Sequence, residues 1–406
     1  MQEHETFAVK ARTILPLADE RPARGSQLFA RLKGIDNAVL LIHAGKVVAL
    51  GKARDVSLPN DCPLTDLGPV CVIPGTINAH CHLDLSYLES KTCWWQGFTP
   101  WLQSLIPLLP RGQVEQKTLE DAVRRACQGL ADCGTAHLGN IAGSADHLLA
   151  LTDQQAEKEG LGISHFCECF GFTESEMAAD NPWPPFVRRD LQEQPNLATH
   201  SALAGHALYS TSAHKLVQAK KFCRKHSRIF SIHLAESPEE TEMLTQGRGR
   251  LFEIFRQSVL PTNWLAPGKR PLAYACALDL MDAETLAVHG VQLDRQEAQV
   301  MAALGASLCL CPRSNHHLNV GAIEVKTLIA ENLLLCLGTD GLTSNTDLDV
   351  CQEAVFLHEQ QGIPGEALIR MLTVNAARAL KLGKYVGRLV PGSPGRFCIL
   401  PQSLRF

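Results

Sequence analysis

Two histidines that are two residues apart, His80 and His82, stand in the stretch PGTINAHCHLDLS, which runs from Pro74 to Ser86. If the apolar residues before them form a strand, alternate side chains point to the same face, and both imidazoles lie on one face near the strand's end. Neutral imidazole nitrogen suits Zn or Fe, so the pair could begin a metal site. The alternative is that one histidine ends the strand and the other faces solvent. Only further ligands downstream can decide between the two.

Polar residues with suitable chemistry follow later apolar runs in the same way. His206 lies in LAGHALYS, and RIFSIHLAES contains His233 and Glu236. His289 is the last residue but one of TLAVHG, and Asp340 ends NLLLCLGTD. A single histidine at such a position is usually a core or surface residue. The repeated placement at the ends of apolar runs instead predicts one shared site.

The elements that must bring these residues together alternate regularly between strand and helix. Helical patterns such as TLEDAVRRACQGLADC, SAHKLVQAKKFCRKH and DRQEAQVMAAL lie between short apolar runs. Such alternation indicates parallel βα units, and eight of them predict an α/β fold with a closed (β/α)8 barrel of the TIM type. Active sites of these barrels gather at the carboxyl ends of the strands. The eight strand candidates are VCVIPGTINAH, GTAHLGNI, GISHFCECF, LAGHALYS, RIFSIHLAE, TLAVHG, ASLCLCP and NLLLCLGTD.

The two ends of the chain have a different pattern. The first seventy residues contain strand-like runs such as FAVKARTIL and AVLLIHAGKVVALG, and the tail GRLVPGSPGRFCIL returns to strand with Gly and Pro between. We therefore expect residues 1–70 and 384–406 to form a small β-sandwich domain. Residues 71–383 would then form the catalytic barrel.

Composition limits the class of protein. Of the 406 residues, 45% are hydrophobic and 20% charged, and the net charge of −4 leaves no basic surface for nucleic acid. No apolar run approaches the roughly 18 residues of a membrane span. The 15 cysteines show no regular framework, and several lie within apolar runs, which favours free thiols in a reducing cytoplasm.

The series PGTINAHCHLD, HALYST, IHLAES, VHG, CPRSN and GTDGLTSN resembles the amidohydrolase superfamily, in its cytosine-deaminase/chlorohydrolase-like branch. The resemblance covers nearly the whole chain. It implies that His80, His82, His233 and Asp340 bind the metal. It also implies that Glu236 is the acid/base glutamate and His289 the histidine of the sixth strand.

The implied chemistry agrees with these residue types. Three imidazoles and one carboxylate leave an open position for water on Zn, which is favoured, or on Fe(II). A divalent ion can lower the pKa of bound water to about 7. Asp340 can then take the proton of the water, Glu236 can carry a proton to a substrate nitrogen, and His289 can hydrogen-bond the attacking water.

One ion is expected, because two-metal relatives generally use a carboxylated lysine from a middle strand. This chain has no lysine between Lys158 and Lys215. Glu168 in FCECFG could bridge two ions instead, although it reads more simply as a substrate-facing or structural residue.

A single metal with the HxxE pattern points to deamination of an aromatic amine. HCHLDLS, GFTPWLQSL, HLAES, WLAPG and CPRSN look most like aminodeoxyfutalosine deaminases, which implies an adenine-type nucleoside as substrate. A departure at the pocket is Gly341, where serine is common. The alternatives are a cyclic amide or imidazolone hydrolase, a deaminase of another purine, pyrimidine or pterin, and a barrel whose metal is structural. The expected partner is a small aromatic amine rather than nucleic acid or membrane, and a homodimer is left open.

Two further residues are assigned to substrate binding. His206 is expected to face the substrate from the fourth strand without binding the metal. Arg313, in CLCPRSNHHL, begins the loop after the seventh strand, where its planar fork could bind a substrate carboxylate bidentately. The alternative for Arg313 is an ion pair with a nearby surface carboxylate.

Overall fold

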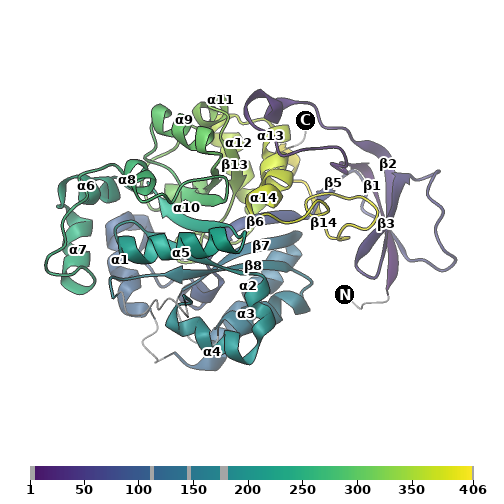
Figure 1. Cartoon of the computed structure of the whole chain (residues 1–406). Coiled ribbons are helices and arrows are strands. Elements are labelled where there is room, and N and C mark those ends of the chain that lie inside the picture. The colour runs from purple at the N-terminus through teal and green to yellow at the C-terminus, as the bar shows by residue number, and fades with distance from the viewer. Residues whose placement is uncertain (1–4, 110–113, 144–147, 174–181, 405–406) are drawn as a thin grey trace.

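The computed structural model describes residues 5–109, 114–143, 148–173 and 182–404. Eight parallel strands form a barrel with helices around it, and the two ends of the chain build a separate six-stranded sheet beside it (Figure 1). The prediction of a (β/α)8 barrel accompanied by a terminal β unit is confirmed.

Each barrel strand pairs in parallel with the strand before and after it in the chain. The last strand meets the first through a parallel bridge between Asp340 and Cys81. Across this closure, the amides of Thr339 and Asp340 both donate to the carbonyl of His80 at 3.1 Å. The strands are β6 (Thr76–Cys81), β7 (Thr135–Ala142), β8 (Gly162–Cys169), β9 (Ser201–Ala207), β10 (Phe230–Leu234), β11 (Thr285–His289), β12 (Ser307–Leu310) and β13 (Leu334–Leu337).

The closure requires a glycine at position 338, immediately after β13. A Cβ at Gly338 would lie 2.8 Å from the carbonyl oxygen of His80 and 2.9 Å from the Cβ of His80. The absence of a side chain therefore lets the end of β13 approach the histidine of β6.

Helices follow the strands, and several pack their apolar sides against the barrel. The three helical patterns expected from the sequence correspond to α2, α5 and α9, and the region after the eighth strand divides into α12, α13 and α14. The α-helices are α1 (Phe98–Leu105), α2 (Gln116–Asp132), α3 (Leu148–Lys158), α4 (Pro185–Glu193), α5 (Ala213–Lys225), α6 (Pro238–Gln246), α7 (Arg250–Ser258), α8 (Pro271–Ala277), α9 (Arg295–Leu304), α10 (Pro312–His317), α11 (Val325–Ala330), α12 (Val350–Gln361), α13 (Gly365–Leu372) and α14 (Val374–Ala379).

The terminal sheet has the order β14-β5-β1-β2-β3, with β4 also paired to β1. Its members are β1 (Thr6–Ile14), β2 (Ile35–His43), β3 (Lys46–Lys52), β4 (Leu64–Asp66), β5 (Cys71–Pro74) and β14 (Phe397–Ile399). Figure 1 shows the yellow C-terminal strand beside the purple N-terminal strands.

The expectation of one strand from Val70 to His80 is wrong in one respect. The segment divides at Gly75, because Cys71–Pro74 pairs with β1 and β14 whereas Thr76–Cys81 pairs with β7. The start of the expected barrel domain therefore belongs to the terminal sheet, and the chain passes from one sheet to the other at Gly75. Within the described ranges, no helix has the length and apolar character needed to cross a membrane.

Candidate active site

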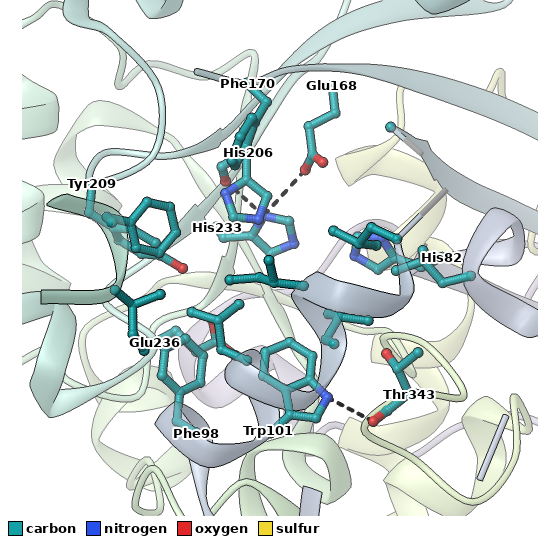
Figure 2. Close-up of a pocket in the computed structure, with 18 of the residues that line it drawn as sticks. His82, Phe98, Trp101, Glu168, Phe170, His206, Tyr209, His233, Glu236 and Thr343 are labelled. Carbon is teal, nitrogen blue, oxygen red and sulfur yellow. Dashed lines mark hydrogen bonds and ion pairs between the residues drawn. The ribbon is translucent and has the colours of Figure 1, made fainter. Parts of the chain in front are cut away.

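A cavity of about 450 Å³ opens at the carboxyl ends of the barrel strands. This volume lies in the range of small-molecule binding sites. Figure 2 shows side chains from several strands and from the loops above them converging on this space. Its polar lining residues are His82, Asp84, Glu168, His206, Tyr209, His233, Glu236, Ser258, His289, Asp340 and Thr343.

The three predicted histidine ligands and Asp340 lie together at this point. Ligand nitrogens of His80, His82 and His233 are within 4.8 Å of one another. The Oδ1 atom of Asp340 lies 3.6 Å from Nε2 of His80 and 3.4 Å from Nε2 of His82. The structure thus brings the four residues into one cluster, although they are spread over 260 residues of the chain (80 to 340).

Hydrogen bonds orient two of these four side chains. Nδ1 of His233 donates to the carbonyl of His206 at 2.7 Å, which leaves its Nε2 with a lone pair for a ligand. The Oδ2 atom of Asp340 accepts hydrogen bonds from Ser314 and Ser344, each at 2.7 Å. Its Oδ1 atom is therefore the one directed to the histidines.

The donor atoms and the burial of this cluster suit a divalent metal ion. His80 is 1% exposed, and neither of its ring nitrogens has a hydrogen-bond partner among the described residues. A buried imidazole whose nitrogens form no hydrogen bond costs free energy, unless one of these nitrogens binds another group such as a metal ion. Burial lowers the pKa of His80 to about 4 against the opposing effect of Asp340, so the ring is neutral at pH 7, as metal binding requires. Three imidazoles with one carboxylate are a donor set that suits Zn or Fe(II).

Glu236 and His289 face each other beside this cluster. Oε1 of Glu236 lies 3.7 Å from Nε2 of His289, and both side chains are at least 90% buried. Nδ1 of His289 donates to Oδ1 of Asn315 at 2.9 Å. Burial, followed by repulsion from Asp340, raises the pKa of Glu236 well above its ordinary value. A raised carboxyl pKa in a cleft is characteristic of a group that exchanges protons near neutral pH.

The backbone at the ends of three strands is left-handed at non-glycine residues. The φ angles are 53° at Ala235, 72° at His289 and 61° at Asp340. Such conformations are unfavourable and persist where surrounding contacts hold them, commonly at functional sites. They turn the chain at His289 and Asp340 themselves and, at Ala235, directly before Glu236.

His206 lines the cavity as expected. Its Nδ1 lies 2.5 Å from the hydroxyl of Ser210, and its ring centroid is 5.2 Å from that of His233. Glu168 also lines the cavity, with Oε1 3.7 Å from Nδ1 of His233 (Figure 2). That Nδ1 already donates to a carbonyl, so the geometry does not favour Glu168 and His233 as joint ligands of a second ion.

The structure does not support the prediction that Arg313 binds a substrate carboxylate. Its guanidinium forms a bidentate ion pair with Asp347, with Nη1–Oδ1 at 2.8 Å and Nη2–Oδ2 at 2.7 Å. Its side chain is 13% exposed, and it does not line the cavity. The alternative, an ion pair with a nearby surface carboxylate, describes this residue, since the side chain of Asp347 is 42% exposed. Both terminal nitrogens of the guanidinium are therefore already paired with Asp347.

Several residues that shape the site were not predicted from the sequence. Ser314, Ser344 and Asn315 hold Asp340 and His289, and their only signal was their position in CPRSN and GLTSN after the seventh and eighth strands. Trp101 and Phe98 of α1 also line the cavity. Their only signal was the stretch GFTPWLQSL, which assigned no role to either side chain.

The sequence model of the amidohydrolase family matches residues 71–403. The chain belongs to the amidohydrolase family. The amidohydrolase chain is 26% identical over 368 residues to the 5′-deoxyadenosine deaminase of Methanothrix thermoacetophila, covering 88% of this chain and 79% of the relative. It is 28% identical over 298 residues to the aminodeoxyfutalosine deaminase of Nitratiruptor sp., covering 71% of this chain and 68% of the relative.

Solved structures share the fold of this amidohydrolase. The aminofutalosine deaminase of Helicobacter pylori, solved in complex with methylthio-coformycin, matches with a TM-score of 0.77 at 20% identity and covers 96% of this chain and 91% of its own. A zinc-bound adenosine deaminase of Xanthomonas campestris matches with a TM-score of 0.73 at 19% identity and covers 96% and 83%.

Proposed function

We propose that this amidohydrolase is a hydrolytic deaminase of adenine nucleosides and uses one divalent ion, Zn or Fe(II). The observation that carries the proposal is the Glu236–His289 pair beside the cluster of His80, His82, His233 and Asp340. A purely structural metal site needs only its ligands. Glu236 and His289 are buried polar residues that are not needed to hold the ion. Relatives named as deaminases of adenosine-type nucleosides support the substrate class.

His80, His82, His233 and Asp340 would hold the ion. When bound, a divalent cation acidifies water, so that a strong nucleophile exists at neutral pH. In the proposed reaction, water oxygen bonds to the carbon that carries the exocyclic amine, and the bond from that carbon to the amine nitrogen breaks. The products are ammonia and the corresponding oxo nucleoside.

The side chains have separate roles in this reaction. Asp340, whose Oδ1 faces the histidines, accepts the proton of the attacking water and passes it to the departing amine, which leaves as ammonia. Glu236 delivers a proton to the ring nitrogen next to the attacked carbon, and its raised pKa allows it to hold that proton beforehand. His289 is held by Asn315 with its Nε2 directed to Glu236, where it can hydrogen-bond the attacking oxygen. His206 contacts the substrate from β9 and stays outside the ligand set, because four ligands are already supplied by other residues and the ion needs an open position.

The test is an assay of ammonia release from a panel of compounds. Adenosine, 5′-deoxyadenosine, 5′-methylthioadenosine, S-adenosylhomocysteine and aminodeoxyfutalosine represent the proposed class. Guanine, cytosine and a pterin represent other aromatic amines, and a cyclic amide and an imidazolone represent ring opening without ammonia. We expect ammonia from at least one adenine nucleoside. Ring opening of either cyclic compound with no release from any nucleoside would establish the alternative.

A further inference from the structure

A second buried carboxylate lies next to the proposed acid/base residue and has no role in the reaction described above. Glu240 is the third residue of α6 and is 1% exposed. Its Oε2 atom accepts a hydrogen bond from the amide of Glu236 at 2.8 Å. Glu240 is not among the residues that line the cavity, so a substrate bound there would not touch it. Any effect of Glu240 on the reaction must therefore pass through another residue, and Glu236 is the one that it holds.

The backbone between β10 and α6 forms a tight turn that places Glu236 at the cavity. Ala235, directly before Glu236, has a left-handed φ of 53°, which is unfavourable for a residue with a side chain. The carbonyls of Leu234 and Ala235 accept hydrogen bonds from the amides of Gly290 and Gln292, at 3.0 and 2.8 Å. The carbonyl side of the turn is therefore fixed by the loop after β11.

Glu240 fixes the amide side of the same turn. Its own amide donates to the hydroxyl of Ser237, the N-cap of α6, at 3.2 Å. In return, the carboxylate of Glu240 accepts from the amide of Glu236. A capping box satisfies amides at the start of a helix in this reciprocal way. In this chain the arrangement also takes the amide of the acid/base residue.

Stability alone does not account for a glutamate at this position. Burial raises the pKa of Glu240 to about 7, and hydrogen bonds from the amides of Glu236, Ala235 and Ser237 act in the opposite direction. A carboxyl group whose pKa is higher in the folded than in the unfolded chain lowers the stability of the folded state as the pH rises through this range. Keeping Glu240 ionised inside the protein thus costs free energy near neutral pH, whereas the turn that it fixes serves the site.

On the basis of the proposed function, we infer that Glu240 is a positioning residue for Glu236. Its carboxylate fixes the turn from β10 to α6 and so keeps the side chain of Glu236 directed to the substrate nitrogen. A displacement of about 1 Å in a reacting group can lower a rate about 100-fold. The hydrogen bond between the two residues therefore affects the chemical step more than substrate binding.

The experiment compares two substitutions that separate the reach of the side chain from its charge. Glu240→Gln keeps an oxygen at the same distance along the side chain and loses the charge, whereas Glu240→Asp keeps the charge and is shorter by one methylene. We expect kcat for ammonia release to stay close to native in Glu240→Gln and to fall by about 10- to 100-fold in Glu240→Asp. KM should change less than kcat, because Glu240 lies outside the cavity lining. Near-native kcat in Glu240→Asp, or an equal loss in Glu240→Gln, would overturn the inference.

A double-mutant cycle tests whether the effect passes through Glu236. In a Glu236→Gln background, Glu240→Asp should lower the remaining kcat by less than about threefold, because the proton carrier that Glu240 positions is already absent. The same fold loss in both backgrounds would show that Glu240 acts elsewhere in the site and would contradict its proposed role. If Glu240→Asp does not fold, Glu240→Ala provides the same comparison, since it leaves no unpaired buried charge.

Glu297→Ala is the matched control, since Glu297 is the corresponding capping glutamate of α9 and does not line the cavity. It should lower the melting temperature and leave kcat unchanged. Metal content and melting temperature are measured for every variant. Absence of ammonia from every nucleoside with the native protein would overturn the proposed function and this inference together. Ammonia release that Glu240→Asp leaves unchanged would overturn the inference alone.

Discussion

Each polar side chain at the site depends on a neighbour that orients it. Asp340 is held by two serines, His233 by a carbonyl and His289 by an asparagine. Such partners decide which atom of each side chain faces the reacting groups. Substitutions at single residues can therefore separate proton transfer from metal binding.

Glu236→Gln should lower kcat by about 100- to 10,000-fold, because the amide cannot carry a proton. Metal content and melting temperature should stay close to those of the native protein, since Glu236 is not assigned to the ion. The measurement is steady-state turnover with metal analysis on the same sample. Glu359→Gln, at an exposed residue of α12, is the control. Near-native kcat in the Glu236 variant would remove this residue from the mechanism.

Ser314→Ala should weaken metal binding or activity by about 10- to 100-fold, because Asp340 loses one of the two hydroxyls that fix its Oδ2. The readout is the metal retained after dialysis against a chelator, together with kcat. Ser57→Ala, in an exposed loop of the terminal sheet, should behave as the native protein. If Ser314→Ala retained metal and activity fully, Ser344 alone would be enough to hold Asp340.

At the scale of elements, α1 connects the mouth of the cavity to two distant segments. The hydrogen bond from Trp101 to the carbonyl of Thr343 joins residues 242 positions apart. This contact keeps the apolar side of the helix over the catalytic residues. Its loss should affect binding more than chemistry.

Trp101→Phe should raise KM about fivefold, because one hydrogen bond is worth roughly 1 kcal/mol and its loss frees α1 to move from the cavity. The change in kcat should be smaller. Steady-state kinetics on an accepted nucleoside measure both. Trp95→Phe is the matched control, since Trp95 is 62% exposed and does not line the cavity. A fall in kcat with unchanged KM would show that Trp101 acts in the chemical step.

At the scale of the whole molecule, Arg370 joins the N-terminal segment to the barrel. Its side chain is 1% exposed and pairs with Glu20 at 2.9 Å. It also donates to the carbonyls of Leu28 and Ala30. The terminal part of the chain is thus tied to α13 by a buried charge.

Arg370→Met should lower the free energy of unfolding by about 3 kcal/mol, because Glu20 and two carbonyls lose their donor. Urea denaturation of the metal-loaded protein measures it. Arg378→Met, at an exposed residue of α14, should have little effect. A loss below about 1 kcal/mol for Arg370→Met would mean that water replaces the lost contacts.

Metal binding also depends on the whole barrel, because the four proposed ligands come from different elements. His80 lies in β6, His82 in the loop after β6, His233 near the end of β10 and Asp340 after β13. We expect about one divalent ion per chain, and its removal by a chelator should lower the melting temperature, because an ion bound only to the folded state stabilises that state. Elemental analysis and thermal denaturation test this. Two tightly held ions would revive Glu168 as a bridging ligand.

The sequence by itself determined the order of strands and helices and the positions of most site residues. Local periodicity marks strands and helices, and the carboxyl ends of barrel strands meet on one face. His80, His82, His233, Glu236, His289 and Asp340 could therefore be assigned together before any distance was known.

Only the tertiary structure decided which groups meet across long separations in the chain. Arg313 and Asp347 are 34 residues apart, and no local pattern shows that the guanidinium turns to this carboxylate and away from the cavity. The split at Gly75 likewise depends on which strands are available for pairing on each side. One side of the cavity is lined by apolar residues of α1 and α7, whose apolar patterns are those of ordinary core-facing helices. Hydrophobic burial is non-directional, so the sequence shows that a side chain leaves water but not what it then contacts.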